Sequence, residues 1–174
     1  MIGMDPWAVR RILRTAGIVL VGIYGIVCAK DPTDFGFLDG VDLIFHEAGH
    51  VIFGVFGEFV GVLGGTLMQV LVPVSIVVYF YVHRQVYSAA VVLFWVAQNC
   101  FNISVYIKDA RAQVLPLLGE GHDWNYLLGR LGLLSWDQAL GNLVYAVGLV
   151  LLGVSVVGGL YAALGREKAE LVPK

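Results

Sequence analysis

The sequence predicts an all-α integral membrane protein with four transmembrane helices and one re-entrant or half-inserted helix. Of its 174 residues, 59% are hydrophobic and 14% are charged, whereas charged residues make up about a quarter of a soluble domain. Four apolar stretches are long enough to cross a bilayer as helices. A further apolar stretch contains two histidines and a glutamate, which are costly to bury in hydrocarbon. We expect a single transmembrane helical domain over residues 1–174, because the helices must share one bundle to bury their polar groups.

The charge and the cysteine content exclude two kinds of protein. The net charge is −2 and there is no basic patch, so nucleic acid is not expected as a partner. The two cysteines, Cys28 and Cys100, lie in apolar segments and make neither a disulfide framework nor a CxxC metal site. Membrane lipids are therefore the first partner that the composition indicates.

The first transmembrane helix is expected from Ile12 to Ala29. As an α-helix this stretch is about 27 Å long, just enough to span the hydrocarbon. Small residues near its end resemble a signal-peptide cleavage site, but we expect an uncleaved helix. The arginines before it, Arg10, Arg11 and Arg14, favour a cytoplasmic N-terminus.

A polar connection, residues 30–42, is expected on the outer side of the membrane. It contains one proline, two glycines and four aspartates. Asp39 or Asp42 can cap the helix that follows. Because Asp42 lies one turn before His46, it could alternatively orient that imidazole as an outer partner.

The motif His46-Glu47-Ala48-Gly49-His50 is the strongest functional signal in the sequence. Positions i and i+4 share one face of a helix, so both histidines can reach one metal ion. Glu47 lies beside that face, within reach of a metal-bound water as general base. A catalytic zinc also needs a third protein ligand, which must come from elsewhere in the chain.

Glycines continue the histidine face in steps of three and four residues. We expect the motif helix to run through them and to end in a tight turn at Gly64-Gly65. Such a bare face favours close packing of membrane helices, although it could instead form a groove for the extended backbone of a substrate. The series is Gly54, Gly57, Gly61 and Gly64.

Two further membrane helices are expected at 66–83, with a weak point at Pro73, and at 85–107. The second carries polar residues in three- and four-residue steps, which should face protein or a cavity. Within this series, Asn99 and Asn102 either bond to a neighbouring helix or lie near the metal. The whole series is Gln98, Asn99, Asn102, Tyr106, Asp109 and Gln113.

The long connection 108–137 is expected to contain a short interfacial helix at 124–134, because tryptophan and tyrosine favour headgroup depth. Ser135 and Gln138 have the spacing of a capping box for the last membrane helix, 138–164.

The distribution of basic residues favours four spans over the alternative of five. With four spans, most of the basic residues lie on the cytoplasmic side, as the positive-inside bias requires. The start of the motif helix and the candidates for third ligand then meet at the outer surface. The residues placed inside are Arg10, Arg11, Arg14, Arg84, Arg166, Lys168 and Lys174.

The third ligand is expected from the connection after the fourth apolar run. His122 is the first choice, because it lies on a glycine-flanked loop that could fold over the site, and Asp109 is the second. Asp109 could instead pair with Arg111 or Lys108. Asp123 is either a ligand or the cap of the short interfacial helix.

A HEAGH motif in an apolar segment, with a later acidic or histidine partner, resembles the intramembrane zinc metalloproteases of the site-2 protease class. The resemblance covers the motif and its helix, some twenty residues. The Asp-Gly signature of that class is not found after the histidines: Asp39-Gly40 precedes them, and Asp109 is followed by Ala110.

The resemblance implies a zinc-dependent peptidase of the cell membrane that acts on a peptide or a membrane protein. His46, His50 and a third ligand would hold Zn²⁺, which lowers the pKa of a bound water. Glu47 would take the proton of that water and pass it to the leaving amine. Asn102, His122 or Arg111 would stabilise the oxyanion.

Three other functions are compatible with the same residues. One is a zinc hydrolase that acts on a lipid or another amide. A second is a metal-binding or transport protein with an ion path through His46, Glu47, His50, Asp109, His122 and Asp123. A third, a di-iron oxygenase, is disfavoured because such sites need two Glu-x-x-His units and the chain has one.

Overall fold

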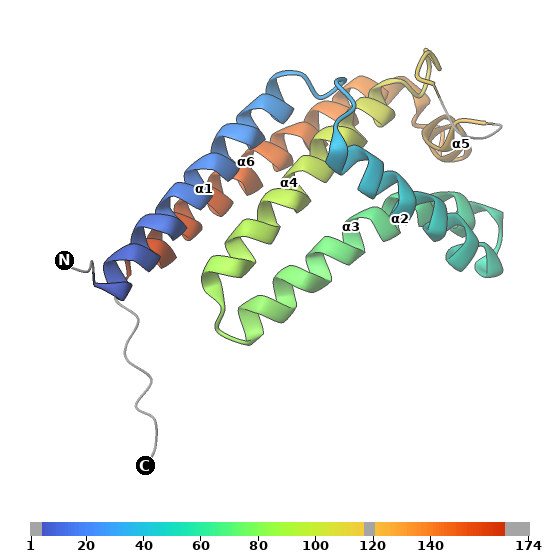
Figure 1. The fold of residues 1–174 in the computed structure, drawn as a ribbon. Helices are drawn as coiled ribbons and strands as arrows, with labels where there is room; N and C mark the ends of the chain where they lie inside the picture. Colours follow the sequence, from blue (N-terminus) through green and yellow to red (C-terminus); the bar gives the residue numbers. More distant parts are fainter. Residues whose placement is uncertain (1–4, 117–120, 166–174) are drawn as a thin grey trace.

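The computed structural model describes residues 5–116 and 121–165, and the regular structure in these ranges is helical (Figure 1). Two 3₁₀ turns, η1 (Gly54–Phe56) and η2 (Leu134–Trp136), join longer helices. The α-helices are α1 (Pro6–Lys30), α2 (Phe37–Phe53), α3 (Glu58–Val82), α4 (Val86–Lys108), α5 (Asp123–Arg130) and α6 (Asp137–Leu164).

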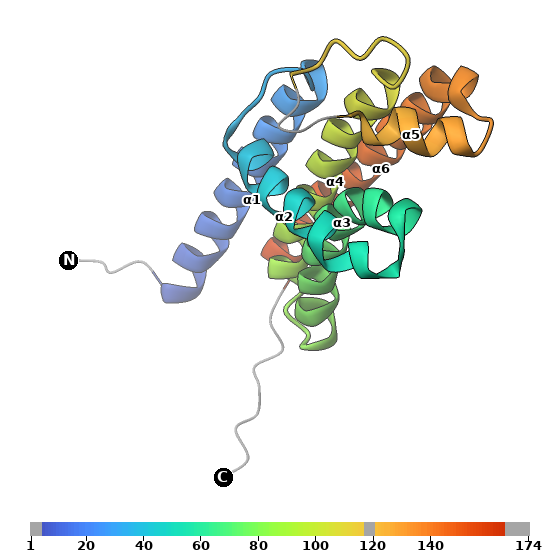
Figure 2. The same ribbon diagram turned by 90° about the vertical axis from the view of Figure 1, so that its right-hand side faces the viewer.

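Four helical segments are long and apolar enough to cross a membrane: α1, α3, α4 and the stretch Leu134–Leu164 that contains α6. The structure thus confirms an all-α membrane protein, and the layout with four spans rather than five. The motif helix α2 is not one of these spans. In both views it crosses the direction of α1, α4 and α6 instead of running along them (Figures 1 and 2).

Helix α4 is the most buried of the four spans and packs against α1, α3 and α6. A core of small and aromatic side chains lies between α1, α4 and α6, centred on Ala97, Phe101 and Leu152. Glycines of α6 let the helices approach, since a Cβ at Gly148 would lie 2.7 Å from the Phe101 ring. The carboxyl ends of α1 and α4 meet the start of α6 at one end of this bundle, where α5 also lies (Figure 1).

The expectation that the motif helix continues through the glycine series is wrong. The helix ends at Phe53, and the chain reverses at Gly57, whose φ of 101° is accessible to glycine and costly for other residues. Gly61 and Gly64 therefore lie on α3 and face back toward α2. The spacing alone could not show this reversal, because it suits a continuous helix equally well.

The close packing predicted from these glycines is present, but it joins two helices. A Cβ at Gly64 would lie 2.6 Å from the carbonyl oxygen of Gly49, and one at Gly61 would lie 2.9 Å from the Cα of Gly54. Backbone thus meets backbone where α2 crosses α3. Gly64-Gly65 lies inside α3 and forms no turn, contrary to the expectation.

Replacing Gly49 with alanine is expected to destabilise the protein by about 1–3 kcal/mol, the usual cost of overpacking. Its Cβ would collide with the Gly64 carbonyl and lie 2.7 Å from the Cβ of Met68. Thermal unfolding in detergent, followed by circular dichroism, measures the loss. Gly54→Ala is the matched control, because a Cβ there meets nothing within 4 Å. Equal unfolding temperatures for the two variants would show that the helices can separate without cost.

Several helix ends differ from the expectation because side chains cap at other positions. Helix α1 begins at Pro6, since the Asp5 carboxylate accepts a hydrogen bond from the Trp7 amide at 3.1 Å. The capping box of Ser135 and Gln138 does not form: α6 has no side-chain cap bond, and the side-chain Nε2 of Gln138 donates to the Lys108 carbonyl at 2.8 Å.

Candidate metal centre

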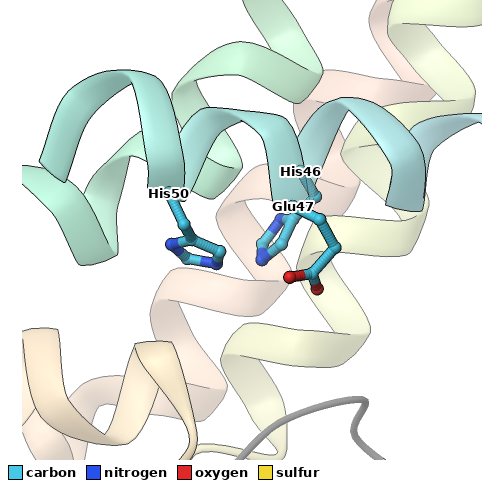
Figure 3. Close-up of side chains that lie close together, drawn as sticks. All are labelled: His46, Glu47 and His50. Carbon is cyan, nitrogen blue, oxygen red and sulfur yellow. The ribbon is translucent and has the colours of Figure 1, made fainter.

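The side chains of His46, Glu47 and His50 project from one side of α2, as the motif predicts (Figure 3). The imidazole rings are 4.8 Å apart between centroids and stand edge to face. One ligand atom from each of the three residues lies within 4.8 Å of the others. These three side chains lie close enough together to hold a metal ion.

Asp123, in the first turn of α5, brings a carboxylate to both histidines. Its Oδ2 lies 2.9 Å from the Nε2 of His46 and 3.2 Å from the Nε2 of His50. The Asp123 side chain is 17% exposed, so these contacts are largely shielded from solvent. Two imidazole nitrogens and one carboxylate oxygen therefore converge on one point.

His122, the first choice for the third ligand, does not join this group. It is buried, its Nε2 lies 3.2 Å from Asp109 Oδ2, and its Nδ1 accepts a hydrogen bond from the Asn125 amide at 3.3 Å. His122 is thus the N-cap of α5, one of the two roles that the sequence suggests for Asp123. Asp109 is occupied as well, because it also accepts from the amides of Val114 and Leu115.

The pairing of His122 with Asp109 has a structural consequence for the site. It ties the end of α4 to the start of α5, and the Asp123 amide donates to the Tyr106 hydroxyl at 3.1 Å. The Tyr106 ring lies between the two histidines that flank it, with centroids 5.9 Å from His46 and 4.4 Å from His122. These contacts hold the Asp123 carboxylate in place.

Each of the two motif histidines is held by a partner on α3. His46 Nδ1 lies 3.1 Å from the Gln69 Oε1, and His50 Nδ1 lies 3.0 Å from the Gly61 carbonyl. Gly65 makes room for both rings, since a Cβ there would lie 2.7 Å from either Nε2. The Nε2 atoms are therefore the ones presented to a metal.

The Asp123 carboxylate favours a positive charge on the His46 ring. Burial lowers the pKa of His46, but the Asp123 carboxylate and the Gln69 amide oxygen outweigh this effect, and the net pKa lies above its ordinary value.

A cavity of about 420 Å³ opens onto the centre. Its apolar wall includes Phe35, Leu43, Val105, Leu115 and Pro116, and its polar residues include Asp39, Glu47, Asn102, Tyr106 and Asp123. None of the described residues that line it is a lysine or an arginine. The size suits a small molecule or a short peptide segment.

The Asp42 carboxylate does not orient the His46 ring, although the sequence suggested it as an outer partner. Its Oδ1 accepts hydrogen bonds from Trp95 Nε1 at 2.7 Å and from Asn99 Nδ2 at 3.1 Å, and its buried Oδ2 has no partner among the described residues. Asn99 therefore bonds to a neighbouring helix, and Asn102 both bonds to neighbouring helices and lines the cavity. Burial raises the pKa of Asp42 to about 6.

Stability should depend on pH through Asp42, and replacement by asparagine should remove this dependence. Its native pKa lies above that of an unfolded aspartate, so its contribution is complete below about pH 4 and is lost as pH rises through about 6. Relative to wild type, Asp42→Asn should therefore gain up to about 3 kcal/mol between about pH 4 and neutral pH. Thermal unfolding of both proteins across this range tests it. A constant difference would mean that Asp42 does not titrate there.

Three residues of the site were missed or given no role from the sequence. Gln69 is 3% exposed in an apolar span, and its polarity there was an available signal. Tyr106 belonged to the polar series of α4 but had no assigned role. The need for Gly65 follows only from how α3 approaches the histidines, which no local pattern reveals.

Comparisons of the chain with protein-family models, with curated protein sequences and with solved structures gave no significant match.

Proposed function

We propose that the chain is a membrane-embedded, zinc-dependent metallopeptidase, with a mechanism like that of the site-2 protease class. The observation that carries the proposal is the approach of Asp123 Oδ2 to within 2.9 and 3.2 Å of the two histidine Nε2 atoms. The motif supplies two ligands from α2, and a separate helix delivers the third.

The donor set fits zinc. Three protein ligands drawn from histidine and a carboxylate, with a fourth position open, are typical of catalytic zinc. Zinc–ligand bonds of about 2.0–2.2 Å place tetrahedral ligand atoms about 3.4 Å apart, close to the observed separations. Zinc held by His46, His50 and Asp123 would polarise a substrate carbonyl and activate a water as nucleophile.

Glu47 is the residue best placed to move the proton. Its side chain is exposed, lines the cavity and follows His46 directly on the same side of α2 (Figure 3). It takes a proton from the attacking water and delivers it to the amine that leaves. No other described carboxylate shares this position, since the Asp39 carboxylate accepts three hydrogen bonds and Asp123 faces the histidines.

Tyr106 takes the role of oxyanion donor in this proposal. Of the three earlier candidates, His122 is paired with Asp109, and Arg111 forms two 2.7 Å contacts with Asp137. Asn102 is held between two partners. The Tyr106 hydroxyl accepts from the Asp123 amide and lines the cavity, so its own hydrogen can be donated to a substrate oxygen.

Tyr106→Phe is expected to lower kcat about 100-fold, the lower end of the effect of losing one oxyanion donor. KM should change little, because the ring and its packing on His46 remain. Zinc content is measured alongside, because the substitution also removes the acceptor of the Asp123 amide. Steady-state kinetics with a cleaved reporter peptide measure the change. An unchanged kcat would remove Tyr106 from the mechanism.

The lining of the cavity favours a peptide over a phospholipid as substrate. The cavity presents carboxylates, which repel a phosphate, and an apolar wall. None of its described lining residues is a lysine or an arginine that could neutralise a phosphate. An uncharged or basic peptide segment meets no such repulsion.

The location in the cell membrane, with the site near the outer face, also belongs to this proposal, and Arg10, Arg11, Arg14 and Arg84 at the opposite end of the bundle support it.

The test combines metal analysis with cleavage assays on the purified full chain in detergent or vesicles. We expect about one zinc per chain. We also expect hydrolysis of a transmembrane reporter peptide, inhibition by a chelator, and no release of fatty acid from phosphatidylcholine vesicles. Wild-type protein without stoichiometric metal would overturn the proposal, and fatty-acid release without peptide cleavage would replace it by a lipid hydrolase.

A further inference from the structure

We infer that Gln69, Asn102 and Asp39 form a hydrogen-bonded relay that fixes the His46 ring for metal binding. The inference rests on the proposed zinc site. The relay joins three helices: His46 Nδ1 to Gln69 Oε1 at 3.1 Å, Gln69 Nε2 to Asn102 Oδ1 at 2.9 Å, and Asn102 Nδ2 to Asp39 Oδ1 at 2.8 Å.

The carboxylate at the far end sets the direction of every bond in the relay. A carboxylate accepts hydrogen bonds, so Asn102 must turn its NH₂ group toward Asp39 and its oxygen toward Gln69. Gln69 must then donate to Asn102, which leaves its own oxygen for His46. His46 can meet that oxygen only with a proton on Nδ1. The relay therefore leaves Nε2 as the nitrogen with a lone pair for a metal.

The Asp39 carboxylate is itself held firmly. Its Oδ2 accepts from the Gly36 amide at 2.9 Å, and its Oδ1 also accepts from Gln98 Nε2 at 2.9 Å. Asp39 lies in the first turn of α2, two turns before His46, so the same helix carries both ends of the relay. The ring of His46 is thus fixed relative to α3 and α4 as well as to its own helix.

The location of the relay gives a reason to treat it as functional. Gln69 is 3% exposed in a span that an apolar residue of similar size would fill at lower cost. His50 needs no such device, because the Gly61 carbonyl already accepts from its Nδ1. Partners of this kind typically change metal affinity 10- to 100-fold, roughly.

In the metal-free protein the relay competes with Asp123 for the His46 proton. Asp123 Oδ2 lies 2.9 Å from Nε2, so a neutral imidazole can donate either to Asp123 or to Gln69. Nδ1 faces Gln69 Oε1 at 3.1 Å, so a metal can replace the Asp123 contact at Nε2 while the Gln69 contact holds the ring in place. Without Gln69, Asp123 is the remaining acceptor among the described partners of the ring, and the direction of Nε2 is no longer fixed from the other side.

The experiment uses the isosteric variants Gln69→Met and Asn102→Leu, with Gln98→Met as the matched control. Gln98 is buried on α4 and donates to the same Asp39 oxygen, but it lies outside the relay. Zinc affinity is measured by competition with a chromophoric chelator. The protonation of His46 Nδ1 is read from ¹⁵N NMR of histidine-labelled, metal-free protein, and thermal unfolding reports the structural cost of each substitution.

We expect Gln69→Met and Asn102→Leu to weaken zinc binding about 10- to 100-fold. We also expect His46 Nδ1 to lose its proton in Gln69→Met and to keep it in wild type and in Gln98→Met. Wild-type affinity in both relay variants, or a wild-type His46 without a proton on Nδ1, would overturn the inference. If wild type binds no zinc, the proposed function fails, while the NMR measurement still decides the relay.

Discussion

Replacing Asp123 with alanine is expected to strip zinc from the purified protein, whereas replacing His122 with asparagine is expected to leave zinc bound. Asp123 supplies a carboxylate oxygen that contacts both histidines, at 2.9 and 3.2 Å. Its loss leaves two imidazoles, fewer than the three protein ligands of catalytic zinc sites. The zinc Kd should rise more than about 100-fold, beyond the effect of losing an outer partner.

His122→Asn is the sharper control because asparagine is among the best N-cap residues. Its side-chain oxygen can replace His122 Nδ1 as acceptor for the Asn125 amide, so the start of α5 is preserved. Metal content of the two variants and of wild type, measured by mass spectrometry after removal of free metal, decides between them. Zinc retained in Asp123→Ala and lost in His122→Asn would make His122 the third ligand after all.

The choice between these neighbours shows what the sequence could not predict. The sequence predicts a short helix from Trp124, with Asp123 either as its cap or as a ligand, and with His122 as the first choice for the third ligand. In the structure His122 is the cap, and α5 begins at Asp123. A difference of one residue at a helix start turns a different side chain toward the histidines. Helix ends are the least certain part of any pattern, since capping depends on tertiary contacts such as that between His122 and Asp109.

Features that depend on local spacing were predicted well. The i and i+4 positions of His46 and His50 place both rings on one face, and four long apolar runs become four helices able to span a membrane. The reversal at Gly57 was missed because its glycine series also suits a continuous helix. The contact between Gln69 and Asn102 could not be predicted from the sequence either, since the two residues lie 33 positions apart on different helices.

Glu47→Gln should keep its zinc and lose about 1,000-fold or more in kcat, within the range for a residue that transfers protons. Glutamine has nearly the same shape and charge distribution as a protonated glutamate, but it cannot accept the proton of the attacking water. The side chain is exposed in the cavity, so the substitution should not alter folding.

Glu58→Gln is the matched control for this prediction. Glu58 is also exposed, at the start of α3, and it does not line the cavity. Its substitution removes the same charge and should leave both zinc content and kcat unchanged.

The comparison separates the possible functions by two measurements on the same samples. Full zinc with no turnover in Glu47→Gln identifies a general base, as a peptidase requires. If Glu47→Gln also loses its zinc, the carboxylate is a ligand, and the residues of the motif are better explained as part of a metal-binding or transport site.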